Sequence, residues 1–466
     1  MKNTHKDTDR YDVVIVGAGV SGAAQAYALA AYSNIGRILV VEKEDTAGAV
    51  NSLPTNNSQT LHEGDIETNY TLEKALTVKH RSGFTKTYVT QKNRGGLYLR
   101  SPKMVLGVGE KEYAFIAERY ETFKKYYPGI ERREKETLEE AEPYICKGRN
   151  PNKKIIALYN PDGLTINYQR LAQSMMEDAI RIASKRGGAV EVMYRARAKN
   201  IRREDGGWIL SAGDRTVHAR FLSVCAGAHS LYFAKKLNIP DAKCISLLPV
   251  AGNFYYTPKY LSAKVYTVQN PKLPFSAVHG DPDILHADRT RFGPTTRIVF
   301  MLERRNYATV FDFLMTLTPF FKSIIAYLRI LLNKDFFYYA FKHNVLFQIP
   351  LLGTYLFWCE AKKIIPSLRR NEIILAKGQG GVRPQIVDTR FKHPLNLGEA
   401  KLCANGVLFN ITPSPGATTS VYNGLVDAQK ITHALEGAFD YDAILNDFGC
   451  PLVRDVTLLK TVGVSV

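Results

Sequence analysis

The chain opens with an apolar run, a glycine-rich turn and a second apolar run. Residues 11–16 (YDVVIV) carry the β-branched side chains that a buried parallel strand favours. GAGVSG follows at 17–22, and the alanine-rich AAQAYALAAY after it predicts a helix. Arg37–Glu42 (RILVVE) predicts a second strand, which ends in an acid. The pattern therefore predicts a β-α-β unit within about 30 residues, the context in which a glycine fingerprint has meaning.

The rest of the chain alternates between polar and patterned stretches. Asp45–Tyr70 is too rich in Asn, Thr, Ser and Gly for regular structure, whereas Lys111–Glu142 is charged and predicts helix. Phe221–Ser230 predicts a strand and turn, and Pro249–His279 alternates as sheet strands do. Gly406–Ser420 predicts a strand and loop that lead into a final helix.

The region 306–358 is unusually aromatic. Its longest stretch without a charged residue or histidine is Asn344–Cys359, 16 residues broken by Pro350 and Gly353. A membrane span needs about 20 residues, so we predict none here. One predicted helix instead gathers its apolar residues on one face, with Lys322 and Arg329 beside them: Phe321, Ile324, Ile325, Leu328, Leu331 and Leu332.

Two interpretations fit that helix. It packs on the protein's own core, as most amphipathic helices do, or it lies on a membrane surface. Residues 300–370 hold ten Lys or Arg against four Asp or Glu. Basic residues around apolar ones favour the membrane surface.

Charge and cysteine content narrow the class of protein. The net charge is +18, from 62 basic and 44 acidic residues, which attracts nucleic acid, anionic lipid or a carboxylate substrate. No two of the six cysteines form a CxxC pair, so we expect reduced thiols and no metal site. The N-terminus has no apolar stretch typical of a secretory signal, and we therefore expect a cytoplasmic protein.

The glycine-rich turn matches a dinucleotide fingerprint. Gly17 permits the tight turn, Gly19 lets the backbone approach a pyrophosphate, and Gly22 lets helix pack on strand. Glu42 is placed to bind ribose hydroxyls, and its charge disfavours NADP. A glycine-rich turn without ligand is the alternative, but strand, helix, second strand and acid are all in register. Because the sequence holds one fingerprint, we expect one bound dinucleotide. Electrons must then leave by a route other than bound NAD(P).

Size and chain order predict two interleaved domains. A chain of 466 residues exceeds the roughly 250–300 at which one core stops growing. We predict an α/β fold, α+β overall, in which a Rossmann-type dinucleotide-binding domain alternates with a substrate domain on a mixed or antiparallel sheet. The boundaries expected are 1–90, 150–245 and 375–466 for the first domain, and 91–149 and 246–374 for the substrate or cap domain.

His279 is the candidate base. It lies in LPFSAVHGDPD, after an alternating strand and before a turn. A neutral imidazole can take a hydroxyl proton at pH 7 while hydride leaves the adjacent carbon. A single histidine among ten is more often structural, and His62 competes for the same role or contacts the cofactor.

Two further segments carry candidate chemistry. Arg383 lies in the Gly-rich GGVRPQIVD, where a rigid guanidinium could grip a carboxylate through two hydrogen bonds. Pro413–Thr419 (PSPGATT) opens the last helix, whose backbone amides and dipole could stabilise a reduced flavin ring. The alternatives are a surface arginine and an ordinary turn with a helix cap.

Several separated blocks together resemble the malate:quinone oxidoreductases, from near residue 11 to about residue 430. Besides the fingerprint, the blocks that carry the resemblance are NSQTLHEGDIETNYT (Asn57–Thr71), LPVAGNFYYTP (Leu248–Pro258), VYTVQNPKLPFSAVHGDPD (Val265–Asp283), RFGPT (Arg291–Thr295), KKIIPSL (Lys362–Leu368), VRPQIVD (Val382–Asp388) and FNITPSPGATTS (Phe409–Ser420).

The resemblance implies a flavoprotein related in fold to D-amino acid oxidase and L-2-hydroxyglutarate dehydrogenase. It implies FAD as cofactor, malate as substrate and, as acceptor, quinone at the inner face of an energy-transducing membrane. We predict that the FAD is non-covalent, since Asp45–Tyr70 has no cysteine. The implied catalytic residues are His279 and Asp281, and the implied substrate ligands are Arg383, His62 and Tyr256. The residues expected at the cofactor are Gly17, Gly19, Gly22, Glu42, Ser58, Gln59, Thr60, Ala226, Gly227, Pro413, Gly416, Ala417 and Thr418.

The chain departs from the family pattern in two places. Gly381 precedes Val382 where an acidic residue is expected, and residues 306–358 diverge. The ligand of a second substrate carboxylate is open, with Arg291, Arg297 and Lys272 as candidates.

Other functions stay open beside malate oxidation. One is an L-2-hydroxyglutarate dehydrogenase on the same fold, because one methylene is worth only about 1–3 kcal/mol of discrimination. Another is a flavoprotein that binds nucleic acid, which the charge permits but no RNA-binding motif supports. A third is a flavin-binding partner without catalysis. We expect no nucleic-acid partner.

Overall fold

The computed structural model describes residues 9–269, 278–396, 399–411 and 416–452. Its first sheet contains the predicted β-α-β unit: β1, α1 (Val20–Tyr32) and β2 follow one another, and β1 and β2 pair in parallel. The strand order in this sheet is β21 (Ala400–Ala404), β22 (Val407–Ile411), β11 (Arg215–Val224), β1 (Arg10–Val16), β2 (Arg37–Val41) and β8 (Ala189–Met193). Two further strands extend it: β10 (Gly207–Ala212) pairs with β11, and β9 (Ala198–Glu204) pairs with β10.

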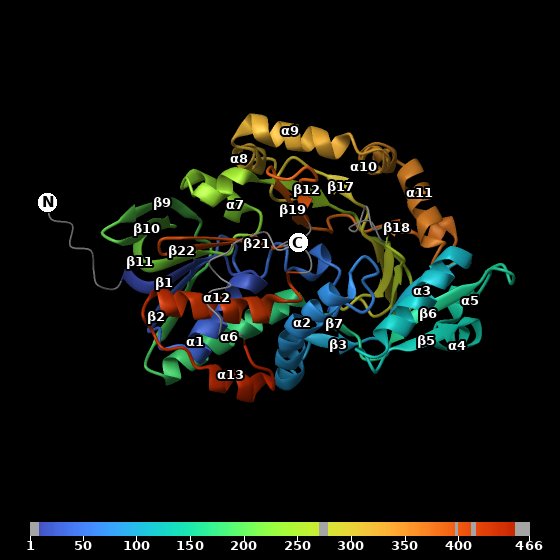
Figure 1. The fold of residues 1–466 in the computed structure, drawn as a ribbon, viewed down its shortest axis with the longest axis horizontal. Coiled ribbons are helices and arrows are strands. Elements are labelled where there is room, and N and C mark those ends of the chain that lie inside the picture. The colour runs from blue at the N-terminus through green and yellow to red at the C-terminus, as the bar shows by residue number, and fades with distance from the viewer. Residues whose placement is uncertain (1–8, 270–277, 397–398, 412–415, 453–466) are drawn as a thin grey trace.

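Helix α1 is the central helix of this half. Every residue of α1 except Ser21 is buried, because α6 (Tyr168–Lys185) and α12 (Ser420–Ala434) pack on it. Small residues allow the close approach: a Cβ at Gly424 of α12 would come 2.6 Å from the backbone of Ala24. Figure 1 shows α1, α6 and α12 on one side of the sheet, with α2 (Leu72–Lys92) and α13 (Tyr441–Phe448) beside them.

The second sheet is mixed, as predicted. Strand β14 pairs with β4 in parallel, and the other pairs are antiparallel. Its order is β18 (Ile374–Leu375), β13 (Tyr255–Pro258), β16 (Arg289–Gly293), β15 (His279–Pro282), β14 (Lys264–Thr267), β4 (Lys103–Val108), β6 (Ile155–Asn160) and β5 (Glu131–Glu134).

The prediction of helix throughout Lys111–Glu142 is wrong in part. Helices α3 (Glu110–Phe123) and α4 (Lys135–Ala141) form, but β5 lies between them and pairs with β6. The charged residues of β5 suit an edge strand, which natural proteins protect with charge, and Arg133 also lies 3.7 Å over the ring of Tyr159. α5 (Pro143–Cys146) follows.

A small sheet joins the two halves. Its strands, in order, are β17 (Arg297–Ile298), β12 (Ile245–Ala251), β19 (Val382–Asp388) and β20 (Leu395–Asn396). A separate two-stranded sheet pairs β3 (Tyr98–Arg100) with β7 (Leu164–Ile166). This arrangement confirms the α/β class. The domain boundaries stay a prediction: β6, expected in the dinucleotide-binding domain, pairs with β4 and β5 of the second sheet.

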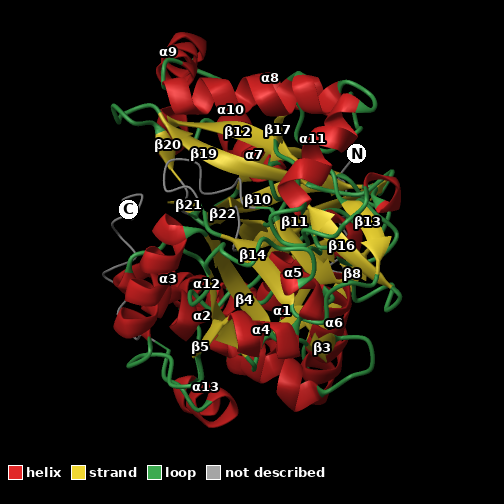
Figure 2. Ribbon diagram, turned by 90° about the vertical axis from the view of Figure 1, so that its right-hand side faces the viewer, coloured by secondary structure: helices red, strands yellow, loops and turns green. Residues whose placement is uncertain are grey.

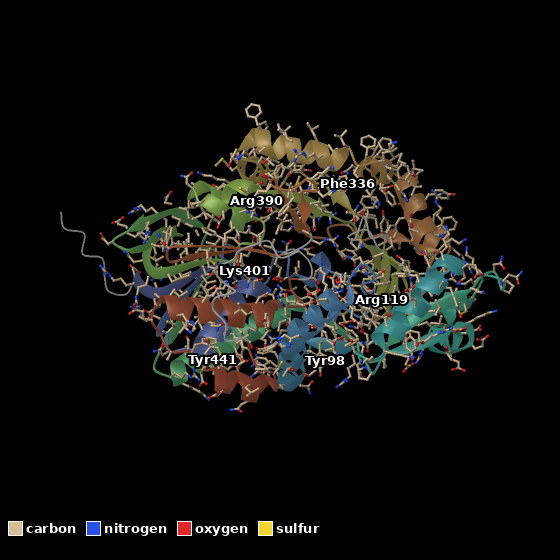
Figure 3. All side chains as sticks on the ribbon, in the orientation of Figure 1. Tyr98, Arg119, Phe336, Arg390, Lys401 and Tyr441 are labelled. Atoms are coloured by element: carbon tan, nitrogen blue, oxygen red, sulfur yellow. The ribbon has the colours of Figure 1, made fainter. Side chains whose placement is uncertain are left out.

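Helices α8 (Thr309–Thr316), α9 (Phe320–Leu331), α10 (Lys334–Asn344) and α11 (Leu352–Ala361) form what we call the surface helix row. In Figure 1, α9 runs along the top, α10 and α11 continue down the right-hand side, and α8 and then α7 (His229–Lys236) lie below the left end of α9. Figure 2 shows α8, α9 and α10 at the top as well. Buried residues of α9 and α10, such as Phe336 (Figure 3), pack on Leu248, Val250 and Val387 of the small sheet.

The outer face of this row is apolar and exposed. Phe321 is 82 % exposed, Leu332 80 % and Phe311 76 %, and Ile325, Leu328 and Leu331 are also exposed. The predicted apolar face of α9 therefore points away from the core. In the described part of the chain no single helix meets the length and hydropathy of a membrane span, although α8 and α9 together do so with a 91° bend.

The predicted polar stretch Asp45–Tyr70 has only one short 3-10 helix, Pro54–Asn56. Buried charges hold it in place. Lys103, which is fully buried on β4, lies 2.7 Å from Glu63 and 3.0 Å from Asp65. Arg119 of α3, labelled in Figure 3, donates to the carbonyl oxygens of Gly64, Glu67 and Tyr70. A segment without regular structure is thus fixed by ionic contacts.

Candidate active site

A cavity of about 470 Å³ lies at the carboxyl ends of β1 and β2. This is where open α/β sheets bind ligands. Its lining includes predicted cofactor residues from three separate parts of the chain: Gly17, Gly19, Glu42, Ala226, Gly227 and Ala417.

The three glycines take the places that the fingerprint assigns. Gly17 has φ +103°, and a Cβ there would come 2.5 Å from the carbonyl oxygen of Cys225. A Cβ at Gly22 would come 1.9 Å from the carbonyl oxygen of Gly17, so α1 can approach β1 only with glycine there. Gly19 caps α1, and its nearest neighbour to an added Cβ is Ser52 Oγ at 3.7 Å. That open space at a helix N-terminus suits a pyrophosphate.

Glu42 joins the turn to the cavity. Its Oε2 accepts a hydrogen bond of 2.7 Å from the backbone N–H of Ala18, and its Oε1 accepts one of 2.9 Å from Glu44. The carboxylate is thereby fixed where β2 ends. An acid held in this way is ready to accept from ribose hydroxyls.

A second cavity, of about 230 Å³, shares Asn51 and Ala417 with the first. Predicted residues from distant segments meet here: Ser58, Thr60, His62, His279, Arg383, Gly416, Ala417 and Thr418. The two cavities are thus adjacent, with the glycine turn in the lining of the first and His279 in the lining of the second.

His279 is buried and held by Asp281. Both lie on β15, and Nδ1 of His279 is 2.7 Å from Oδ2 of Asp281. Burial lowers the pKa of His279 below its usual 6.5, an effect that outweighs the attraction of Asp281. Burial alone would raise the pKa of Asp281, but His279 and Lys264 lower it further, so this carboxyl is ionised. The result is a neutral imidazole oriented by a carboxylate, the arrangement of a general base.

Two neighbours from β14 support this pair. The ring of Tyr266 stacks on His279 with centroids 4.6 Å apart, and its hydroxyl lies 2.6 Å from Thr60 Oγ1. The fully buried Lys264 lies 3.7 Å from Asp281 and donates to the carbonyl oxygen of Ser58. Burial lowers the pKa of Lys264 to about 8. His279 therefore has little freedom to turn.

Arg383 reaches the second cavity from β19. Its Nη2 is buried without a hydrogen-bond partner, and no carboxylate of the described residues lies within ion-pair distance of its guanidinium. Burial lowers its pKa from 12.5. A buried arginine without a counter-charge is costly unless a ligand supplies one. The site is thus suited to a carboxylate.

His62 lines the same cavity but is engaged differently. Its Nδ1 lies 2.5 Å from Oε1 of Glu67, and its Nε2 lies 3.4 Å from Ser58 Oγ. Its backbone N–H donates to Thr418 Oγ1. His62 thus connects the polar stretch to the start of α12, which leaves His279 as the better placed base.

Four predicted residues line neither cavity: Gly22, Gln59, Tyr256 and Asp281. Tyr256 donates a 2.9 Å hydrogen bond to Asp283 and accepts one from Gln379, and its expected contact with substrate stays a prediction. Gln59 is fully buried, with φ +58°, and donates to Asp283 as well. Tyr256 and Gln59 thus brace the loop after β15. Pro413 lies outside the described residues.

The candidates for a second carboxylate ligand also fare differently from expectation. Arg291 is fully buried and donates to the carbonyl oxygens of Pro54 and Asn57, and Arg297 donates to Gln348. Neither lines the second cavity. Lys272 lies outside the described residues.

Sequence reasoning missed Tyr266, Tyr168 and Lys74, which also line the second cavity. Tyr168 donates to the carbonyl oxygen of Thr60 and lies 3.1 Å from Thr418 Oγ1. The sequence held one signal for Tyr266: it lies in a segment that alternates as a strand does, where residues 264 and 266 share a face. No local signal distinguishes Lys74 from other lysines.

The two adjacent cavities together suit FAD. The glycine turn and Glu42 are suited to the adenosine diphosphate, and the polar residues Ser58, Thr60 and Thr418 of the second cavity are suited to a flavin ring next to His279. Added Cβ atoms at Gly17 and Gly22 would collide with backbone, so these positions are built for close approach.

The family model and the similar proteins found by comparison agree on one family. The family model for malate:quinone oxidoreductase (Mqo) matches residues 9–320. The malate:quinone oxidoreductase of Helicobacter pylori (strain ATCC 700392 / 26695) is 38 % identical over 458 residues, which is 94 % of this chain and 97 % of that protein. A probable malate:quinone oxidoreductase of Campylobacter jejuni is 40 % identical over 453 residues, with 93 % and 97 % covered.

Solved structures show the same fold at low identity. L-α-glycerophosphate oxidase of Mycoplasma pneumoniae with FAD bound has a TM-score of 0.64 at 16 % identity, covering 92 % of this chain and 96 % of that one. Glycine oxidase of Geobacillus kaustophilus has a TM-score of 0.60 at 19 % identity, covering 96 % and 99 %. With the family model and relatives that span almost the whole sequence, this chain belongs to the malate:quinone oxidoreductase family.

Proposed function

We propose that this protein is an FAD-dependent malate dehydrogenase that oxidises (S)-malate to oxaloacetate and passes the electrons to a membrane quinone. The observation that carries the proposal is the second cavity. It combines a buried histidine whose pKa lies below 6.5 with an arginine whose buried Nη2 has no hydrogen-bond partner and which has no carboxylate partner among the described residues. A 2-hydroxy acid needs both a base for its hydroxyl and a cation for its carboxylate.

The side chains divide the work as follows. Arg383 binds the carboxylate next to the reacting carbon and fixes its orientation through paired hydrogen bonds. His279 takes the hydroxyl proton, and the carboxylate of Asp281 stabilises the imidazolium that results. Tyr266 keeps the imidazole in place and helps to exclude water.

FAD is proposed to be held without a covalent bond. The residues that would hold it are Gly17, Gly19 and Glu42 at one end and Thr60, Ala417 and Thr418 at the other. When bound, it supplies the acceptor for the hydride from the hydroxyl-bearing carbon of malate and returns two electrons to quinone. Acid precipitation tests the linkage: flavin released into the supernatant supports the proposal, and flavin retained on the pellet contradicts it.

The surface helix row is proposed to lie on the inner face of an energy-transducing membrane. Its exposed Phe321, Leu328 and Leu332 form an apolar face, and the exposed Lys322 and Arg329 lie beside it. Apolar side chains enter the bilayer boundary while basic ones meet anionic headgroups. A peripheral cytoplasmic protein docked there would reach a quinone confined to the bilayer.

The first experiment is anaerobic. The purified protein is mixed with L-malate, and the visible absorbance of bound flavin is followed; a short-chain quinone is then added. Bleaching by malate and recovery with quinone support both half-reactions. Bleaching by L-2-hydroxyglutarate but not by malate would keep the reaction class and change the substrate. An oxidised flavin with both acids would refute the proposed function.

A further inference from the structure

A four-carbon dicarboxylate brings two negative charges into the site, and Arg383 accounts for one. The inference that follows rests on the proposed function. The second cavity holds one more cation that is not ion-paired, Lys74 on α2, because His62 is in contact with Glu67 and His279 is neutral.

Lys74 lies in the first turn of α2. Its backbone N–H donates to the side chain of the N-cap, Thr71. Its ammonium is 4.9 Å from the ring centroid of Tyr70, and both side chains line the second cavity. The segment on which they depend is held by Arg119, which donates to the carbonyl oxygen of Tyr70.

The other lysines of α2 all have polar partners. Lys79 donates to the carbonyl oxygen of Tyr126, Lys86 pairs with Glu63, and Lys92 pairs with Asp178. Within the part of the chain that the structure describes, Lys74 has neither a hydrogen bond nor an ion pair from its ammonium group. Lys74 thus differs from the other lysines of α2 because its ammonium group lacks a polar partner, which a ligand would supply.

Its surroundings make this cation unfavourable without a ligand. Burial lowers the pKa of Lys74 from 10.5. A positive charge in the first turn also opposes the helix dipole. The carboxylate that lines the same cavity, Glu67, is already 2.5 Å from His62. An incoming anion would offset both costs.

Other arginines near the site are committed elsewhere. Arg291 and Arg297 hold backbone and side-chain oxygens away from the cavity. Arg304 donates to the carbonyl oxygens of Gly252 and Gln379 and does not line the cavity. The geometry points to Lys74 as the residue that binds the second carboxylate of the substrate and so selects dicarboxylic over monocarboxylic 2-hydroxy acids. Because lysine is a point charge on a flexible stem, we expect it to select for the charge more than for chain length.

The test compares two substrates of equal skeleton. (S)-2-Hydroxybutanoate has a methyl group where malate has its second carboxylate. In the holoenzyme we expect Lys74→Met to lower the ratio of kcat/KM for malate to kcat/KM for (S)-2-hydroxybutanoate by about 10–100-fold, the range for a lost hydrogen bond to a charged group. Lys74→Arg should keep most of the ratio. Lys111→Met, at an exposed lysine of α3, is the matched control.

A binding measurement makes the test independent of turnover. Succinate and butanoate are titrated against the bound-flavin spectrum of wild type and Lys74→Met. The preference for succinate should fall by a similar factor in the variant. An unchanged preference in both measurements, with normal flavin content, overturns the role of Lys74. If Lys74→Met loses flavin, Lys74→Gln replaces it. Failure of wild type to oxidise malate would instead refute the proposed function, and the succinate titration would still judge Lys74.

Discussion

His279 and Asp281 lie on one face of strand β15, with Nδ1 of the imidazole 2.7 Å from Oδ2 of the carboxylate. Residues two apart on a strand share a face, so the strand itself sets this pair. At this distance we expect the carboxylate to favour the tautomer with its proton on Nδ1, which would leave Nε2 free to accept a proton. The fully buried Asp281 does not line the cavity, and its influence passes through His279.

We expect Asp281→Asn to lower kcat for malate by about 10²–10⁴-fold, the range for a disabled general base. The amide can donate to Nδ1 and so favours the wrong tautomer. Stopped-flow reduction of the flavin measures the effect on the chemical step. KM should change far less than kcat. A variant with wild-type reduction rates would contradict the orienting role.

The pH dependence of kcat/KM should reflect the lowered pKa of His279. A base works in its neutral form, which dominates above its pKa. Because burial lowers that pKa below 6.5, we expect kcat/KM to fall on the acidic side with a midpoint below pH 6.5. The measurement is initial rates with saturating quinone across pH 5–8. A midpoint above pH 6.5 is the opposite result.

Arg383→Lys should reduce kcat/KM for malate by about 10–100-fold, since a point charge cannot reproduce two parallel hydrogen bonds to a carboxylate. It should reduce kcat/KM for (S)-2-hydroxybutanoate by a similar factor, in contrast to a change at Lys74. Arg202→Lys, at an exposed residue of β9, is the control. Equal activity of both variants would remove Arg383 from the site.

Gly22→Ala should weaken both folding and flavin retention. The added methyl would lie 1.9 Å from the carbonyl oxygen of Gly17, and forced overpacking costs about 1–3 kcal/mol. Thermal unfolding and the flavin-to-protein ratio measure the two effects. Gly83→Ala is the matched control, because it lies in α2 with open space around it. That change should raise stability by about 0.5–1 kcal/mol.

Replacing Phe321, Leu328 and Leu332 by Asn should abolish binding to vesicles that contain anionic lipid. Each large apolar side chain contributes about 1.5–3 kcal/mol when buried, so affinity should fall by at least 100-fold. Stability should change little, because the side chains are exposed. Leu99, Ile180 and Leu445, also exposed but on elements in the lower part of both views, provide a triple control. Equal cosedimentation of the two variants would argue against docking through this row.

Local pattern predicted much of the fold and part of the site. The β-α-β unit, the irregular Asp45–Tyr70 and the exposed apolar face of α9 depend on short-range periodicity, which the sequence displays directly. His279 and Arg383 could be named because an imidazole suits hydroxyl deprotonation, a rigid guanidinium suits a carboxylate, and the family resemblance implies both roles. The structure places both of them on one cavity.

The contacts that the sequence does not reveal are those that strand register and packing decide. Tyr256 and Tyr266 lie on similar alternating strands, yet one braces Asp283 and the other stacks on His279. Arg291 pairs with Asp281 across β15 and β16, yet its guanidinium is held by the carbonyl oxygens of Pro54 and Asn57. Lys74 reaches the cavity because α2 packs beside a loop fixed by Lys103, Glu63 and Asp65. Contacts between residues so far apart in the sequence produce no periodic pattern from which they could be predicted.

The surface helix row has a consequence for the two halves of the proposed reaction. Malate diffuses in aqueous solution, whereas a membrane quinone is confined to the bilayer; under the proposed docking, the exposed face that carries Phe321 and Leu332 would bring the protein to the quinone. Without a soluble acceptor, a molecule detached from the bilayer would accept one pair of electrons from malate and then stop. Attachment therefore decides whether the protein acts stoichiometrically or as a catalyst.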